Sequence, residues 1–247
     1  MSIIFETRDS HSPYVETVTQ GYTASDGFTI HPADIHWYMV LRRLNGKVHL
    51  LVVGPHTASG GLTYGEGAEL LWIKIKLGTY MPHLPAREYV DEEMTLPGAA
   101  SRSFWLKGSA REFPDFDNVE TFIERLAREE VLVRDPVVEA ALQDHLPEMS
   151  PRTVRHRFLQ STGLSQIHIR QYERALRAEA LLGQGMSILD TVHSLGYFDQ
   201  PHLTRSLKQF IGYTPAQIVQ MSNPESCHFI QDNQRSPEYN TNQIDNI

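Results

Sequence analysis

The sequence predicts an α+β protein in which a β-rich N-terminal domain is followed by an all-α domain. Three observations lead to this prediction. Up to about residue 116, short runs of β-branched and aromatic residues alternate with Gly, Pro and Asn, as in a sheet with many tight turns. From residue 117 onward, apolar residues recur at helical spacing. Within the helical part, residues 150–163 and 199–212 repeat one pattern.

The composition allows two domains, each with its own core. The chain has 247 residues, of which 40% are hydrophobic and 21% charged. We expect a β domain over 1–116, a linker helix over 117–134, a helical domain over 135–221 and, because its composition is polar, a disordered tail over 222–247. The single cysteine, Cys227, excludes a disulfide framework.

The sequence also bears on location. No basic segment precedes an apolar run near the start, so we expect no signal peptide. No apolar stretch approaches the ~20 residues that a membrane helix needs, so we expect no membrane contact. A cytoplasmic protein is therefore expected.

Short strands dominate the expectation for the N-terminal domain. Residues 1–25 show no strong period and are expected to be irregular, with at most one edge strand. Ile35–Leu41 and Val48–Val53 flank Asn45-Gly46, a strong hairpin signal. Further strands are expected at Leu62–Tyr64, Leu70–Leu77, Glu93–Leu96 and Ser103–Leu106. Many short strands between turns indicate a small barrel or a double-sheet, cupin-like domain.

A linker helix is expected over about Asn118–Val131. Asp117 and Glu120 have the spacing of a capping box. An apolar stripe follows, made of Val119, Phe122, Ile123 and Leu126. Packing of this stripe on one of the two domains is favoured over a dimerising coiled coil, because the helix holds fewer than three heptads.

The two repeated stretches are expected to be short helices with one apolar and one polar face. Ser150 and Asp199 are suited to capping their N-termini, and each stretch has a proline in its first turn. Gly163 and Gly212 can take the left-handed conformation that follows a helix. The apolar residues are Val154 and Phe158 in the first stretch and Leu203, Leu207 and Phe210 in the second. The opposite faces carry Arg, Gln and His, as expected of recognition helices.

Other helices should support this pair. Pro136–Asp144 precedes the first stretch, and Ser187 caps a helix before the second. Ser165–Leu182 should form one connecting helix of roughly 27 Å, at ~1.5 Å for each residue. Because major-groove faces recur at ~34 Å, such a connector can hold two recognition helices near adjacent turns of a duplex. A last helix is expected over Ala216–Met221.

The segments SPRTVRHRFLQSTGLS and GYFDQPHLTRSLKQFIGYTPAQI resemble the DNA-binding domain of AraC/XylS-type transcription regulators. The resemblance covers about Asp135–Gln220, and the two matched halves with the closing Gly212–Pro215 make it specific. It implies two helix-turn-helix units that bind double-stranded promoter DNA, and activation through RNA polymerase rather than repression. A small-molecule effector and a homodimer are left open. The sequence departs from the family pattern at Pro147, in the first turn, and at Val192, where a small alanine is usual.

The resemblance assigns DNA contacts residue by residue. Base-reading positions fall on Arg152, Arg155 and His156 in the first unit and on Gln200, Pro201, His202 and Arg205 in the second. Arg suits guanine, Gln suits adenine, and apolar atoms suit the thymine methyl. Phosphate contacts, which fix register, fall on Arg157, Thr204, Lys208 and Gln209.

The distribution of charge is uneven. The net charge is −8. Residues 1–135 carry 13 basic and 19 acidic side chains, residues 136–220 carry 8 and 7, and residues 221–247 carry 1 and 4. The acidic excess thus lies outside the helical domain, whose arginines form a local patch. We expect modest non-specific affinity for DNA.

The aromatic residues of the β domain allow two interpretations. Trp37, Tyr38, Trp72 and Trp105 could line an effector pocket, or they could simply form the core, which is the simpler interpretation. Val52–Thr57 resembles a hairpin exit in uncharacterised sensor domains of similar regulators, and this resemblance gives no ligand.

The competing class is a cupin-like, metal-dependent enzyme with a helical extension. The β domain contains His31, His36, His49, His56 and His83. Cupin sites need His-x-His with a following Glu, and this spacing is absent, so we expect no metal and no cofactor. The sequence also has no Gly-x-Ser-x-Gly, no glycine-rich phosphate loop and no His-Glu-x-x-His. We therefore expect that the protein is not an enzyme.

Overall fold

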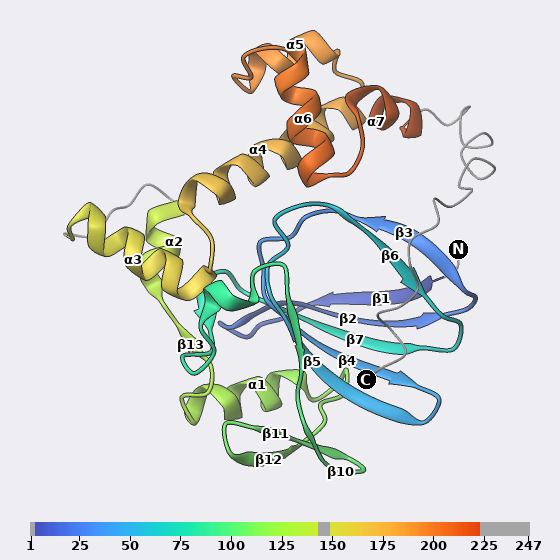
Figure 1. The fold of residues 1–247 in the computed structure, drawn as a ribbon, viewed down its shortest axis with the longest axis vertical. Helices are drawn as coiled ribbons and strands as arrows, with labels where there is room; N and C mark the ends of the chain where they lie inside the picture. The colour runs from blue at the N-terminus through green and yellow to red at the C-terminus, as the bar shows by residue number, and fades with distance from the viewer. Residues whose placement is uncertain (1–2, 143–148, 223–247) are drawn as a thin grey trace.

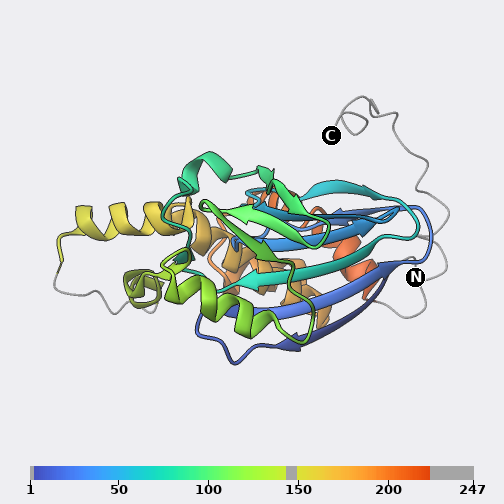
Figure 2. The same ribbon diagram turned by 90° about the horizontal axis from the view of Figure 1, so that it is seen from below.

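The computed structural model describes residues 3–142 and 149–222. It shows a sheet-rich N-terminal part and a helical C-terminal part (Figures 1 and 2). Beyond residue 222, the tail that was expected to be disordered lies outside the described residues. Pro147 also lies outside them. In the part of the chain that the structure describes, no helix is both long and apolar enough to span a membrane.

The main sheet is antiparallel and open. Its strands lie in the order β1 (Ile3–Asp9), β2 (Val15–Thr23), β7 (Glu69–Ile75), β4 (Tyr38–Leu44), β5 (Lys47–Val53) and β9 (Glu93–Thr95). β4 and β5 form the hairpin that Asn45-Gly46 predicts, with Leu44 opposite Lys47. Because β1 and β9 are edge strands that do not pair with each other, this sheet does not close into a barrel.

Smaller sheets and the helices complete the chain. The remaining strands are β3 (Gly27–His31) with β6 (Gly60–Tyr64), β10 (Gly98–Ala100) with β11 (Ser103–Leu106) and β12 (Ser109–Glu112), and β8 (Thr79–Tyr80) with β13 (Val133–Arg134). The helices are η1 (a 3-10 helix, Ala86–Tyr89), α1 (Val119–Arg128), α2 (Pro136–Leu142), α3 (Pro151–Thr162), α4 (Gln166–Gly183), α5 (Ile188–Ser194), α6 (Gln200–Phe210) and α7 (Pro215–Met221).

The prediction for residues 1–25 was wrong, because two long strands lie there. β2 pairs with β1 on one side and with β7 on the other. Its register shifts between Val15 and Thr17, so Val15 and Val18 are both buried although three positions separate them. This irregularity hides the period of two that marks a half-buried strand in a sequence.

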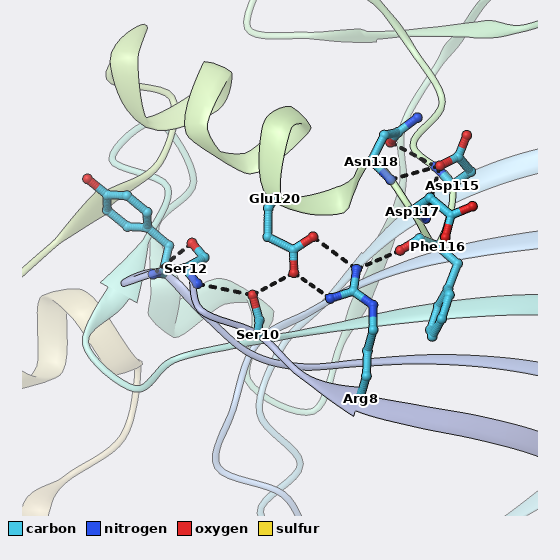
Figure 3. Close-up of polar contacts among 9 residues, drawn as sticks. Arg8, Ser10, Ser12, Asp115, Phe116, Asp117, Asn118 and Glu120 are labelled. Atoms are coloured by element: carbon cyan, nitrogen blue, oxygen red, sulfur yellow. Dashed lines mark hydrogen bonds and ion pairs between the residues drawn. The ribbon is translucent and has the colours of Figure 1, made fainter.

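Helix α1 packs on the β domain, in agreement with the favoured interpretation of the linker. Its four stripe residues are buried together with Met39, Ile73 and Phe104 of the sheets. The capping-box prediction was wrong. Glu120 does not cap α1; instead it binds Arg8 of β1 (Nη1–Oε1 2.6 Å) and accepts a hydrogen bond from Ser10 (Figure 3). The contact with Arg8 lowers the pKa of Glu120 to about 2.

A second core joins the helices to the β domain. Residues of α2 to α7 pack with Ala33 and Ile35, which lie between β3 and β4. Their largest fully buried side chains include Phe158, Ile169 and Leu203. Since residues from the first 116 positions belong to this core, the domain boundaries stay a prediction.

Candidate nucleic-acid interface

Helix α3 forms as its sequence predicts. Ser150 accepts a hydrogen bond from the backbone N–H of Thr153, and Pro151 occupies the first turn. Val154 and Phe158 are buried on the inner face. Gly163 follows with a φ of 77°, which a left-handed helix ending requires. The polar face, with Arg152, Arg155, His156 and Gln160, is exposed.

Helix α6 has the same features as α3: a capped N-terminus, a buried apolar face and an exposed polar face. Asp199 accepts a hydrogen bond from the backbone N–H of His202 at 2.7 Å. Leu203, Leu207 and Phe210 are buried, whereas Gln200, Pro201, Arg205, Lys208 and Gln209 are exposed. His202 and Thr204 are half-buried, and the Thr204 hydroxyl donates to the carbonyl of Gln200. Thr204 is therefore already bonded within the helix, while the side chains of Gln200 and Arg205 have no partner among the described residues.

The cations on these two helices differ in their partners. Arg152, Arg155, Arg205 and Lys208 make no side-chain hydrogen bond or ion pair with any residue of the described ranges 3–142 and 149–222. Arg157 instead binds Asp135 through two nitrogens, each at 2.8 Å. Asp135 is only 7% exposed. Arg157, expected to contact phosphate, is therefore held in an ion pair within the protein, whereas the other four cations are not held by any described residue.

The connecting helix α4 has the expected length. It spans Gln166–Gly183, or roughly 27 Å at ~1.5 Å for each residue, and Ser165 caps it through the backbone N–H of His168. Ile169, Tyr172 and Ala175 line its buried side. α4 packs against α5, α6 and α7 and carries the second unit. α3 packs mainly against α2, η1 and β8.

The β domain holds the C-terminal ends of both recognition helices. The last carbonyls of α6 accept hydrogen bonds from it: Lys208 from the Ser59 hydroxyl (3.0 Å), Gln209 from the Ser59 N–H (2.7 Å) and Phe210 from the Ala33 N–H (2.7 Å). These carbonyls have no partner inside their helix. At the end of α3, a Cβ on Gly163 would lie 2.7 Å from the carbonyl of Ala86 in η1. Figure 1 shows both helices with their C-terminal ends towards the β domain.

A groove of about 390 Å³ lies beside α3. Its walls are Tyr80, Pro82, Leu84, Pro85, Ala86 and Arg87 on the β-domain side and His156, Leu159 and Gln160 on α3. His156, a predicted base-reading residue, thus faces residues 80–87 as well as solvent. A duplex that reaches His156 must also fit beside this segment.

A charged cluster is formed by Asp34 and His36, which lie between β3 and β4, and by Glu16 of β2. His36 Nδ1 lies 2.6 Å from Asp34, and His36 Nε2 lies 3.1 Å from Glu16. Burial opposes the charge of His36, but the two carboxylates raise its pKa. The hydrogen bond with His36 lowers the pKa of Glu16 to about 2. Burial and then the charges of Asp34 and Glu16 raise the pKa of Tyr172 in α4. Ile35, which lies between Asp34 and His36, is buried in the same core as Tyr172, so the cluster lies at the contact between the two parts.

The four aromatic residues of the speculative ligand pocket do not converge. Trp37 belongs to the first core, with Met39 and Ile73. Trp72 lies next to Ile73 in β7, so its side chain points to the opposite face of the sheet, where Tyr38 also lies. Trp105 is 46% exposed on β11. The structure therefore favours separate structural roles for these side chains.

The histidines of the β domain are dispersed. His31 and His56 have ring centroids 5.0 Å apart, and His36 binds two carboxylates. Within residues 3–142 and 149–222, no group of three or more His, Cys, Asp or Glu is arranged to hold a metal ion.

The sequence analysis did not predict the hydrogen bonds between the β domain and α6, and it did not single out the exposed residue Phe198. Ser59 and Ala33 lie in loops, and nothing in their sequence marks a partner that is about 150 to 180 positions away. Phe198, between the two helices of the second unit, is 91% exposed. Its place just before the capping Asp199 could have drawn attention to it.

Comparison with known proteins adds a family match. Residues 148–221 match the family described as "Helix-turn-helix domain". The HTH-type transcriptional regulator RipA of Corynebacterium glutamicum is 32% identical over 89 residues, which are 35% of this chain and 27% of that protein. The chain thus spans about a quarter of this relative's length. ToxT of Vibrio cholerae O395, crystallised with (E)-4-(8-methylnaphthalen-1-yl)but-3-enoic acid, overlaps 90% of this chain and 100% of that chain, at 10% identity and a TM-score of 0.33.

Proposed function

We propose that this chain, whose residues 148–221 are a helix-turn-helix domain of the AraC type, is a sequence-specific DNA-binding regulator of transcription. One observation carries the proposal. Two capped helices in matched units expose four cations, Arg152, Arg155, Arg205 and Lys208, that lack partners among the described residues. Such helices suit the major groove, where bases present distinct donors and acceptors.

Electrostatics distinguishes this surface from the rest of an acidic protein. Phosphate contacts release counterions, so the logarithm of the affinity falls with the logarithm of the salt concentration by about 0.9 for each phosphate neutralised. These four cations are few, and non-specific binding should therefore be weak. Recognition then depends on the base contacts proposed for Arg152, Arg155, Gln200 and Arg205.

Selection of duplexes from a random pool tests the proposal. The full chain should enrich one sequence with two separate conserved segments, and the selected duplex should bind at least ~10³-fold more tightly than random DNA at equal salt. A double Arg155→Ala, Arg205→Ala variant should enrich nothing. Equal binding of all duplexes by the unmodified chain would contradict sequence-specific function.

The β domain is proposed to control DNA binding through the ends of the recognition helices. Ser59, Ala33 and η1 contact these ends, so a change in the β domain alters how α3 and α6 are held. We further propose a small-molecule effector of this domain. A ligand that binds only the folded state raises the thermal midpoint. A metabolite panel should yield one compound that raises this midpoint and also changes the affinity for the selected duplex.

The regulator is proposed to activate transcription through RNA polymerase, on the basis of the family resemblance. Run-off transcription from a promoter that carries the selected sequence tests the sign. Transcript should increase when the chain is added and should not increase on a promoter with a scrambled site. Elemental analysis of the purified chain checks the alternative of a metal-dependent enzyme, which requires a stoichiometric metal ion.

A further inference from the structure

Phe198 is the most exposed large apolar side chain in the part of the chain that the structure describes. Its exposed fraction is 91%, well above the 70% of Ile167 and the 61% of Leu189. Scattered exposed apolar residues are normal on protein surfaces. The position of Phe198 sets it apart, because it immediately precedes Asp199, the residue that caps α6.

The backbone around Phe198 is fixed. Gly196 makes the turn with a φ of 66°. The next residue, Tyr197, is buried; its hydroxyl lies 3.2 Å from that of Ser206, and the guanidinium of Arg174 lies 4.4 Å from its ring centroid. The N–H of Phe198 donates to Nδ1 of His202 at 3.3 Å. The backbone that carries the exposed ring is therefore already ordered, which lowers the conformational entropy lost on binding.

The neighbours of Phe198 indicate what the ring meets. A recognition helix directs its N-terminal residues at base edges in the major groove. Gln200 and Pro201, the first residues of α6, are exposed, and Arg205, unpaired among the described residues, follows one turn later. Phe198 thus adds an apolar surface to a polar end of the helix. The C5-methyl of thymine is the apolar group that base edges offer in this groove, and Phe is suited to contact it.

We propose that Phe198 reads thymine, by contact with its C5-methyl group, in the half of the DNA site bound by the second helix-turn-helix unit. The inference rests on the proposed function and names a base preference that the polar residues of α6 do not supply. Pro201 is the other apolar residue at this end of the helix.

Replacement of thymine by deoxyuridine tests the contact, because it removes only the methyl group. Each thymine of the selected duplex is replaced in turn, and binding is measured by fluorescence anisotropy for the full chain, Phe198→Ala and Leu189→Ala. The unmodified chain should lose about 4-fold in affinity at one position of the second half-site, as expected for one methyl group. Phe198→Ala should bind the thymine duplex at least ~4-fold more weakly and show no further loss with deoxyuridine.

Two controls show whether an effect of Phe198→Ala is specific to this side chain. Leu189→Ala removes another exposed apolar side chain of the same unit and should keep the full response to deoxyuridine. Circular dichroism should show that Phe198→Ala remains folded, since the ring packs against little.

The inference is overturned if the second half-site contains no thymine, if no deoxyuridine weakens binding, or if Phe198→Ala keeps the response. Loss of transcription without loss of DNA affinity would assign the ring to a protein partner and also overturn it. Failure to enrich any sequence would instead overturn the proposed function, and this inference with it.

Discussion

Arg155 and Arg157 lie two positions apart on α3 and have opposite surroundings. Arg155 is exposed without a partner among the described residues, whereas Arg157 binds the buried carboxylate of Asp135. The same side-chain chemistry is therefore available for the proposed recognition of DNA at one position and is held in an ion pair at the other. Two substitutions on this helix should separate the roles.

Arg157→Ala should destabilise the fold. It leaves the carboxylate of Asp135 buried without its cation, and an unsatisfied buried group of this kind costs about 1–3 kcal/mol. Arg155→Ala should change the free energy of unfolding by less than about 0.5 kcal/mol, as exposed positions usually do. Urea unfolding followed by circular dichroism measures both. Equal stability of the two variants would mean that the Arg157–Asp135 pair contributes nothing.

Arg205→Ala should weaken specific binding by about 1–3 kcal/mol and relax the preference at one base pair. The reason is that the proposed bidentate contact to guanine is lost, while no buried side chain of the fold is changed. Anisotropy titrations with the selected duplex and with single-base variants measure this. Arg128→Ala, the same change at an exposed position of α1, serves as the control. An equal loss on random DNA would assign Arg205 to a phosphate instead.

The C-terminal ends of both recognition helices, α3 and α6, contact the β domain. Gly212 follows α6 with a φ of 91°, and a Cβ there would lie 2.6 Å from Ile30 of β3. Gly185, after α4, has a φ of 90°, and among the described residues no atom would lie within 4 Å of a Cβ added to it. Substitution of these two glycines thus separates two costs of an added side chain: the cost of a positive φ, which both positions share, and the cost of a steric clash with the β domain, which only Gly212 has.

Gly185→Ala should cost about 1–2 kcal/mol, since alanine resists the left-handed region. Gly212→Ala should cost about 1–3 kcal/mol more, because the β domain must also move. It should in addition speed amide hydrogen exchange at Ser59 and Ala33, whose N–H groups donate to the carbonyls of Gln209 and Phe210 at the end of α6. Unfolding and hydrogen exchange measure these effects. Identical costs for the two variants would show that the contact between the two parts is loose.

The elements also show what a sequence can predict. Helices α3 and α6 were predictable because caps, proline, apolar spacing and a closing glycine all agree within a short stretch of each. The β4–β5 hairpin was predictable from Asn45-Gly46. β1 and β2 were missed because a register shift hides the period of β2. The contacts of Ser59 and Ala33 with α6 depend on tertiary placement, and no local pattern encodes them.

For the whole molecule, the cluster around His36 couples stability to pH. The pKa of His36 is raised, so its contribution is full below about 6.5 and is lost as the pH rises through the folded value. The pKa values of Asp34 and Glu16 are lowered to about 2, so their contribution is lost as the pH falls from about 4.5 towards 2. Lys74 also faces the cluster and binds Glu16 at 3.0 Å. The cluster is therefore most stabilising between about pH 4.5 and 6.5.

His36→Gln should lower the free energy of unfolding by about 1–3 kcal/mol at about pH 5.5, where charge-assisted hydrogen bonds to Asp34 and Glu16 are lost. The difference from the unmodified chain should be smaller at about pH 9 than at about pH 5.5, because the charged form of His36 loses population as the pH rises. Urea titrations at the two pH values measure it. A difference that does not depend on pH would mean that His36 is neutral in the folded protein.

The central claim is that α3 and α6 occupy neighbouring major grooves of one duplex. Hydroxyl-radical footprinting of the full chain on its selected duplex tests this most directly. The account predicts two protected segments about 10 base pairs apart on one face of the DNA, with Arg155→Ala weakening one segment and Arg205→Ala the other. A single protected segment, or the same loss at both segments for each variant, would contradict it.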